Sequence, residues 1–217
     1  MSRIISYSTA DTSHVIGFLG AAGRFTDEQR RLAGIMREEA RGAQKEIDRQ
    51  DLGWELTVPE ALEHLLAGHA SSTAVAAGNA YAAAMQVVID CNASDPMDLG
   101  TFSRPATFFG ELDKELLRLG VPADLLPGGF IMGGLPAGLP FSLPSTEDAM
   151  ERFGYWPLEK TLPAADAYRA VLDRVDEAFT YDLDQLVEKL TCEHEEWVVS
   201  QDIDWYTQDT VFFSITG

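Results

Sequence analysis

The chain carries a short strand-like segment near each end, and most of the sequence between them is patterned as helix. RIISYS (residues 3–8) alternates so that Ile5 and Tyr7 share one face, and TVFFSIT (residues 210–216) is a second apolar run. Strands at both ends with helices between them are typical of an α+β fold, in which the terminal strands can pair in one sheet. We therefore predict a single α+β domain over residues 1–217, mostly helical, with a small sheet that includes the N- and C-terminal strands.

Several helices are marked by their first residues. Thr26 and Gln29 form a capping-box pattern before an amphipathic stretch that runs to residue 50, and Thr57 and Glu60 repeat the pattern. Gly68 suits the exit of this second helix. An alanine-rich helix is expected over residues 71–90, where small side chains let neighbouring elements approach closely. Further helices are expected after Asp11 and over residues 108–120, 163–179 and 182–201.

Composition limits the classes of function. The 217 residues can form one substantial hydrophobic core. The net charge of −19 argues against binding nucleic acids, which are recognised through Lys and Arg, and against anionic membrane surfaces. It permits a basic protein partner, although an acidic surface also serves solubility alone.

The sequence favours a cytoplasmic location. No apolar stretch approaches the roughly 18 residues needed to span a bilayer, and the N-terminus lacks the apolar core of a signal peptide. The two cysteines, Cys91 and Cys192, are expected to be separate thiols, because secreted domains held by disulfides usually carry more.

Three stretches resemble the YfbM-like group of uncharacterised bacterial proteins: MSRIISYSTADTSHVIGFLG, WELTVPEALEHLLAG and DWYTQDTVFFSITG. In that group a strand, an aspartate and a short helix come first, and a helix runs into a closing strand. A histidine of the group falls one position before His64, where this chain has Glu63. The central stretches GNAYAAAMQVVIDC and LLRLGVPADLL resemble a related domain of unknown function. The resemblance implies a fold class and brings no catalytic signature.

The segment LLPGGFIMGGLPAGLPFSLP (residues 125–144) combines glycines, prolines and apolar side chains without a single charge. One interpretation is an apolar lid or pocket wall, because long ordered loops in compact domains are often functional. The other is a buried connection without a ligand. Both explain the absence of charge, since a segment that covers either a ligand or a core must exclude water.

His194 is the candidate catalytic residue. It falls on the apolar stripe of its helix, one turn after Leu190 and three residues before Trp197. An imidazole on a buried face is most often a core histidine whose ring nitrogens have partners. The alternative is a general acid or base beside an apolar cavity.

Polar side chains on the alanine-rich helix are candidate ligand-binding residues. Asn79 and Gln86 lie seven residues apart on one face, with Tyr81 to the side. Such groups need hydrogen bonds if they are buried, and neighbouring backbone can supply them. Alternatively, they point into a small-ligand cavity whose other wall is the Gly/Pro segment.

No metal or cofactor is expected. The chain lacks a phosphate-binding glycine loop before a helix, a nucleophile elbow and an HExxH helix. Cys192 and His194 are two apart on a helix and cannot face one ion, and His64 and His69 are separated by five residues with Gly68 between them.

Two functions remain open, and a third interpretation is a scaffold with no functional site. The first is binding of an apolar small molecule, as a cofactor-free cyclase, isomerase or hydrolase if the protein is an enzyme, in an enclosed pocket lined by Phe130, Met132, Trp156 and Trp197. The second is an acidic protein-interaction module, such as an immunity-type inhibitor of a basic toxin. That function predicts an open acidic face with exposed aromatic side chains at its centre.

Overall fold

The structure is a computed structural model that describes residues 2–217. Its internal contacts divide the chain into two compact units. The sheet unit comprises Met1–Ala10, Pro96–Leu135 and Arg152–Gly217, and the helical unit comprises Asp11–Asp95 and Pro136–Glu151. The α+β class is confirmed, with one small antiparallel sheet and helices elsewhere. The single domain over residues 1–217 stays a prediction.

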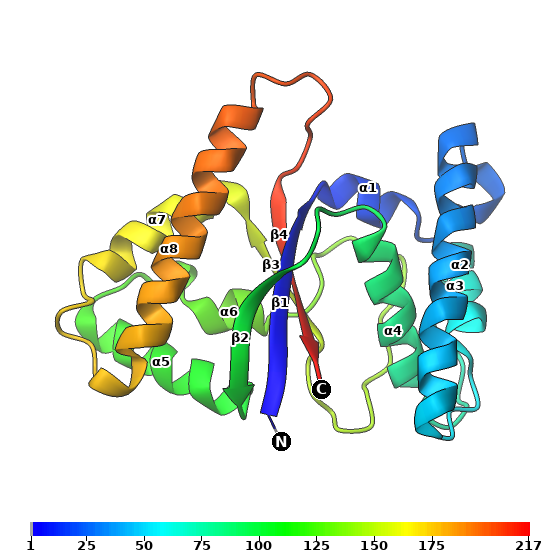
Figure 1. The fold of residues 1–217 in the computed structure, drawn as a ribbon, viewed down its shortest axis with the longest axis horizontal. Coiled ribbons are helices and arrows are strands. Elements are labelled where there is room, and N and C mark those ends of the chain that lie inside the picture. Colours follow the sequence, from blue (N-terminus) through cyan, green and yellow to red (C-terminus); the bar gives the residue numbers. More distant parts are fainter. Residues whose placement is uncertain (1) are drawn as a thin grey trace. The chain divides into compact units, whose positions relative to one another are not determined.

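The sheet unit contains all four described strands, and both terminal segments take part. They are β1 (Ser2–Ala10), β2 (Met97–Ser103), β3 (Phe153–Pro157) and β4 (Thr210–Thr216), in the order β2-β1-β4-β3 (Figure 1). All three pairings are antiparallel. The pairing of β1 with β4 confirms that the terminal strands lie side by side.

The register brings a set of apolar side chains to one face of this sheet. Tyr7 lies opposite Phe213, and Trp156 lies opposite Val211 two residues earlier on β4. Directly opposed residues point to the same side, and residues two apart share a face. All four of these side chains are buried, so this face forms the core of the sheet unit.

Four helices of the sheet unit lie to one side of the sheet in Figure 1. They are α5 (Pro105–Leu119), α6 (Pro127–Ile131), α7 (Leu158–Arg169) and α8 (Glu177–Ser200), with a short 3-10 helix at Ala123–Leu125. The helices α7 and α8 pack along one another, and α6 packs against both α5 and β3. The long helix α8 supplies an apolar stripe that includes Leu183, Leu186 and Leu190.

The helical unit holds α1 (Thr12–Gly17), a 3-10 turn at Ala22–Arg24, α2 (Asp27–Gln50), α3 (Val58–Ala67) and α4 (Ala77–Asp90). Helices α2, α3 and α4 pack against one another. Both predicted capping boxes are present, one starting at Thr26 and the other at Thr57. Asp11 caps α1 by accepting hydrogen bonds from two backbone N–H groups, and Gly68 ends α3 in the left-handed conformation.

Two predicted helices have different boundaries in the structure. The alanine-rich helix starts at Ala77 instead of residue 71, because Ala76 takes a left-handed conformation with φ of 59°. The helix expected over residues 163–179 is wrong as a continuous element. It is divided between α7, which ends at Arg169, and α8, which begins after Asp176. The Asp176 side chain accepts a hydrogen bond from the Ala178 backbone N–H, which makes it a helix N-cap and favours a new start there.

Candidate functional site

Two small recesses in the sheet unit adjoin one another and form a groove along α8. The aromatic recess is lined by Leu99, Phe102, Phe108, Phe109, Leu112, Asp182 and Leu186. The tyrosine recess is lined by Tyr7, Leu99, Leu186, Lys189, Leu190, Glu193, Val211 and Phe213. Leu99 and Leu186 belong to both. Each recess encloses about 10 Å³, which is about the space of one water molecule.

Leu99 lies in the groove at a β-bulge in β2. Gly100 pairs with Ile5 of β1 and Asp98 pairs with Ser6, so Leu99 is the extra residue. Gly100 has φ of 143°, a conformation that residues other than glycine rarely adopt. Its backbone N–H donates a 2.8 Å hydrogen bond to the Asp98 carboxylate. Bulges turn individual side chains out of the strand's regular alternation. This one puts an apolar side chain at the junction of the two recesses.

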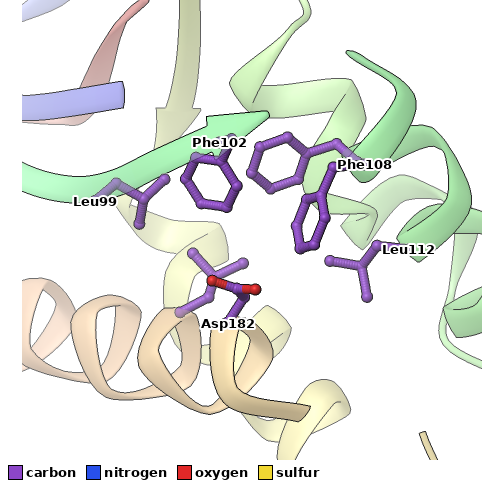
Figure 2. A pocket seen from close by; sticks show the side chains of 7 residues that line it. Leu99, Phe102, Phe108, Leu112 and Asp182 are labelled. Atoms are coloured by element: carbon purple, nitrogen blue, oxygen red, sulfur yellow. The ribbon is translucent and has the colours of Figure 1, made fainter. Parts of the chain in front are cut away.

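Aromatic rings make one wall of the aromatic recess (Figure 2). Phe102 of β2 lies 5.1 Å from both Phe108 and Phe109 of α5, measured between ring centroids. Figure 2 shows the Asp182 carboxyl of α8 directed toward the space between Leu99 and these rings. Burial raises the pKa of Asp182, because an apolar surrounding disfavours the charged form.

Glu193 is the chemically distinctive residue of the tyrosine recess. Glu193 is only 7% exposed, although its side chain is a carboxylic acid. Burial is the main cause that raises the pKa of Glu193, and the nearby Glu196 raises it further. A hydrogen bond with Tyr7 and the charge of Lys189 act in the opposite direction. A buried carboxyl with a raised pKa is a candidate proton donor or acceptor.

Tyr7 completes the polar part of this recess. Burial raises the pKa of the Tyr7 hydroxyl, and so do the charge of Glu193 and the hydrogen bond to it. The same hydroxyl lies 3.6 Å from the Met97 sulfur, but a thioether is a weak acceptor compared with a carboxylate. Tyr7 is therefore a neutral hydroxyl that donates to the Met97 sulfur, with the Glu193 carboxyl nearby.

Lys189 supplies the positive charge. Its ammonium group donates a hydrogen bond of 2.8 Å to the backbone carbonyl of Asp98 and lies 5.7 Å from the centroid of the Tyr7 ring. The bond to Asp98 fixes the lysine at the bulged end of β2. Lys189 thus favours the ionised form of Glu193 without a direct ion pair.

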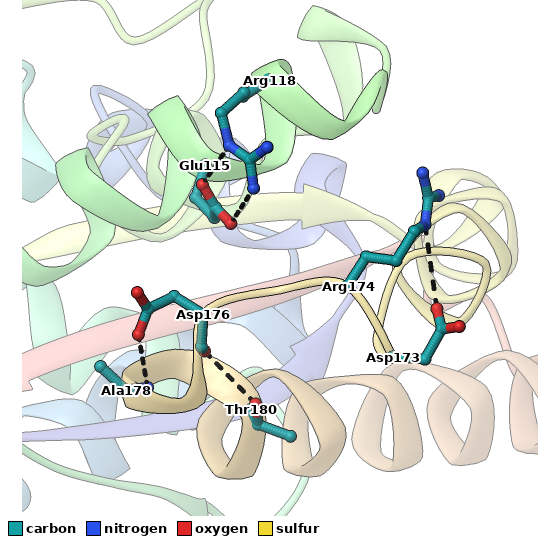
Figure 3. A network of polar contacts seen from close by, with 7 residues as sticks. All are labelled: Glu115, Arg118, Asp173, Arg174, Asp176, Ala178 and Thr180. Carbon is teal, nitrogen blue, oxygen red and sulfur yellow. Dashed lines mark hydrogen bonds and ion pairs between the residues drawn. The ribbon is translucent and has the colours of Figure 1, made fainter.

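Polar contacts hold Glu115 and Arg118 together in α5, and others hold residues 173–180 together at the start of α8 (Figure 3). Glu115 of α5 receives two hydrogen bonds from Arg118, at 2.6 and 2.7 Å. Asp176 is the N-cap of α8. The hydrogen bonds from Arg118 are the main cause that lowers the pKa of Glu115, and the backbone of Asp176 adds to it.

His194 follows Glu193 in α8 but lines neither recess. A helix turns about 100° per residue, so consecutive side chains point in different directions. The His194 ring meets Trp197 edge-on, with centroids 5.6 Å apart. Its Nδ1 atom is buried and has no hydrogen-bond partner within residues 2–217. The catalytic role of His194 stays a prediction.

The aromatic residues expected to line an apolar pocket are distributed over the sheet unit. Phe130 of α6 stacks on Trp156 of β3, with ring centroids 4.2 Å apart and planes 12° from parallel. Trp156 is fully buried, and its indole N–H has no partner among the residues that the structure describes. Trp197 contacts His194 instead, and Met132 follows the end of α6. None of the four lines either recess of the groove.

The first part of the Gly/Pro segment is a packed connection. Residues 127–131 form α6, whose last carbonyls lie against β3 at Gly154. A Cβ atom at Gly154 would come within 2.2 Å of the Phe130 carbonyl oxygen, so only glycine allows this approach. The Gly128 N–H donates a 2.9 Å hydrogen bond to Asp113 of α5.

The polar residues of α4 all have protein partners within the helical unit. Asn79 donates to the Glu147 carboxylate at 2.9 Å and accepts from the Glu147 backbone at 3.2 Å. Gln86 donates to Asp90 at 2.6 Å. These bonds give Asn79 and Gln86 a structural explanation, and their role in ligand binding stays a prediction.

Tyr81 is fully buried in α4, and its hydroxyl joins two segments. It lies 2.8 Å from His64 Nδ1 and accepts a 3.0 Å hydrogen bond from the Ser72 backbone N–H. The His64 and His69 rings are 4.6 Å apart. Tyr81 therefore anchors the irregular stretch before α4 to α3.

The cysteines are separate thiols, as predicted. Burial raises the pKa of Cys91 to about 11 and also raises the pKa of Cys192. Thiols of this kind hold little thiolate at neutral pH and are poor nucleophiles. Within residues 2–217, no three His, Cys, Asp or Glu side chains are grouped to hold a metal ion.

Sequence reasoning missed Tyr7, Asp182, Lys189 and Glu193 as candidate site residues. On α8, position 193 follows Leu190 by three residues and position 194 follows it by four, so both can extend the apolar stripe. The structure buries Glu193 and leaves His194 half-buried. A signal was available in the spacing of Leu186, Leu190, Glu193 and Trp197, which places a carboxylate in the middle of an apolar row.

The sheet unit defines an α+β protein with a groove that carries one buried carboxyl, Glu193, and one half-buried carboxyl, Asp182. The chain matches a domain of unknown function, DUF7691, over residues 1–214, and it belongs to that family. Neither the curated proteins nor the solved structures include a match. The family match does not connect the chain to the YfbM-like group, so that resemblance stays a prediction. None of the helices within residues 2–217 has the length and apolar character needed to cross a bilayer.

Proposed function

We propose that the protein binds a small, largely apolar molecule in the groove of the sheet unit and exchanges a proton with it through Glu193. The observation that carries the proposal is the burial of Glu193, which is only 7% exposed, in a mostly apolar recess that it shares with Tyr7 and Lys189. Structural carboxylates are almost never buried without a full ionic partner. A function that requires a proton donor or acceptor at this position would explain why a carboxyl group is buried here.

The chemistry that suits this arrangement is cofactor-free proton transfer, as in an isomerase, a cyclase or a hydrolase. Because burial raises the pKa of Glu193, its carboxyl is easier to protonate than an exposed one at the same pH. In an isomerisation, Glu193 would take a proton from one carbon of the substrate and return it to another, with no net gain or loss of electrons. Tyr7 would donate a hydrogen bond to the substrate or to Glu193 during this transfer.

The size of the recesses limits the ligand. Each encloses about 10 Å³, so each accommodates one substituent, and drug-sized ligands need pockets of about 300–1,000 Å³. The body of the molecule would lie across Leu99 and Leu186, which join the recesses. Carboxyl groups at both ends, Asp182 and Glu193, favour a ligand with a cationic or hydrogen-bond-donating group.

The test uses fluorine NMR of three probes with the full chain: 4-fluorobenzylamine, 4-fluorobenzyl alcohol and 4-fluorobenzoate. We expect the amine to bind best and the carboxylate worst, because of the two carboxyl groups. Glu193→Gln should weaken amine binding, since it removes the charge that the amine would meet. Glu188→Gln is the matched control, because Glu188 is an exposed carboxylate of the same helix. Equal effects of both variants, or no binding of any probe, would overturn the proposal.

The net negative charge also suggested binding of a basic protein. We assign that second function to a different surface of the sheet unit, formed by the end of α8 and the turn after it.

A further inference from the structure

The end of α8 and the turn that follows it present apolar side chains to solvent. Trp205 is 80% exposed and Val199 is 74% exposed. Val198 and Ile203 are exposed as well, and we call these four residues the tryptophan surface. Globular proteins seldom leave a cluster of large apolar side chains uncovered, and such clusters often mark interaction sites.

The turn that carries Trp205 is held by hydrogen bonds. The Ile203 N–H donates to the Ser200 carbonyl, and the Tyr206 N–H donates to the Ile203 carbonyl, both at 2.9 Å. The Tyr206 hydroxyl donates to the Gln208 side chain at 2.6 Å, and Thr9 of β1 donates to the same Gln208 oxygen. The tryptophan surface is thus presented from a defined backbone, which lowers the entropy lost when a partner binds.

The chain segment that forms this surface carries only negative charge. Residues 190–217 contain no Lys or Arg, and they contain the carboxylates Glu193, Glu195, Glu196, Asp202, Asp204 and Asp209. Asp202 and Asp204 alternate with Ile203 and Trp205 in the turn. Within the described part of the chain, neither aspartate forms an ion pair. The complement of this surface is therefore apolar and positively charged.

We propose that the tryptophan surface docks a protein segment that carries both Lys or Arg and apolar side chains. Exposed tryptophans are frequent energetic anchors of protein interfaces, and a lysine or arginine can also lie over the indole face. The aspartates beside Trp205 raise the rate of encounter with a cationic partner. Nucleic acids and anionic membranes do not fit, because their charge has the same sign as the turn.

The test measures fluorescence anisotropy of a labelled amphipathic Lys/Leu peptide titrated with the full chain, at low salt and at about 0.15 M salt. We expect Trp205→Ala to weaken binding about tenfold or more, which is the range of interface anchors. Asp202→Asn with Asp204→Asn should weaken binding and reduce its dependence on salt. Neither change touches the groove, so groove binding should be unaffected.

The matched control is Tyr181→Ala. Tyr181 is 74% exposed near the start of the same helix, with Asp182 and Asp184 beside it, so it reproduces an exposed aromatic among carboxylates. Its loss should leave peptide binding unchanged. An equal loss in Tyr181→Ala and Trp205→Ala would overturn the proposal. Equal affinity for a Lys/Ser peptide of the same charge would also overturn it, as would failure of the wild type to bind the Lys/Leu peptide.

Discussion

The Tyr7 hydroxyl in the first strand donates a 3.6 Å hydrogen bond to the Met97 sulfur and lies close enough to the Glu193 carboxyl in the last helix for Glu193 to raise the pKa of Tyr7. The Tyr7 and Glu193 side chains come from opposite ends of the chain and meet in a recess whose other walls are mostly apolar. Electrostatic interactions between polar groups are stronger in such a low-dielectric surrounding than in water. The first strand and the last helix therefore bring together the two titratable groups whose pKa values are raised in this recess.

The stability contributed by Glu193 should depend on pH in a defined direction. Its pKa is raised in the folded protein, so protonation stabilises the fold fully at pH values below the unfolded pKa. This contribution is lost as the pH rises through the folded pKa. Glu193→Gln cannot ionise, so it should melt a few degrees above the wild type at about pH 8 and close to it at about pH 4. Thermal melts at both values check this, with Glu188→Gln as the control. A Glu193→Gln protein that melts below the wild type at the higher pH would contradict it.

Gly78 should tolerate no side chain. An added Cβ would lie 2.0 Å from the Ser145 carbonyl oxygen, and backbone cannot move aside cheaply. We expect Gly78→Ala to lower the free energy of unfolding by about 2–4 kcal/mol, as overpacking against a fixed neighbour does. Gly42→Ala in α2 is the control, because nothing lies within 4 Å of the added atom. That change should stabilise the protein by about 0.5–1 kcal/mol. Urea unfolding of both variants gives the comparison, and similar values for the two would contradict the packing described.

Tyr81→Phe tests whether the α4 tyrosine is structural. The change removes the oxygen that contacts His64 and accepts from the Ser72 N–H. Leaving such groups without partners costs about 1–3 kcal/mol. Denaturant unfolding should show a loss in that range. Tyr181→Phe, at an exposed position, should lie within about 0.5 kcal/mol of the wild type. An unchanged stability of Tyr81→Phe would indicate that water replaces the hydroxyl.

His194→Ala should cost less than a core histidine would. Because Nδ1 has no partner within residues 2–217, the change strands no group bonded to that atom. The main loss is the edge-on contact with Trp197, and we expect a decrease of about 1 kcal/mol or less. A calorimetric melt measures this. A loss of about 3 kcal/mol would assign His194 to the core instead.

Local sequence signals predicted much of the fold. Helix starts were found because capping depends on residues three apart, as in Thr26 with Gln29 and Thr57 with Glu60. The strands β1 and β4 were found from their apolar runs. The strands β2 and β3 were missed, because β2 contains a bulge at Leu99 and Gly100, and β3 is a five-residue element that ends in a proline.

The candidate site was harder to predict because its residues are far apart in the sequence and come together only through strand pairing and helix packing. Tyr7 becomes a site residue only when β1 pairs with β4 and α8 covers the same face. On α8 itself, the periodicity allowed either Glu193 or His194 to face inward, and the packing against β1 and β4 decided between them.

The order of the strands has a consequence during synthesis. β1 is made first and needs β2 and β4 on its two edges, but β4 is the last described element to be made. Until then one edge of an apolar strand stays open, and open edges are sites of aggregation. The unfinished sheet unit is therefore exposed to aggregation until β4 has been synthesised. Contacts in residues 11–95 are closer in sequence and can form while the ribosome is still translating.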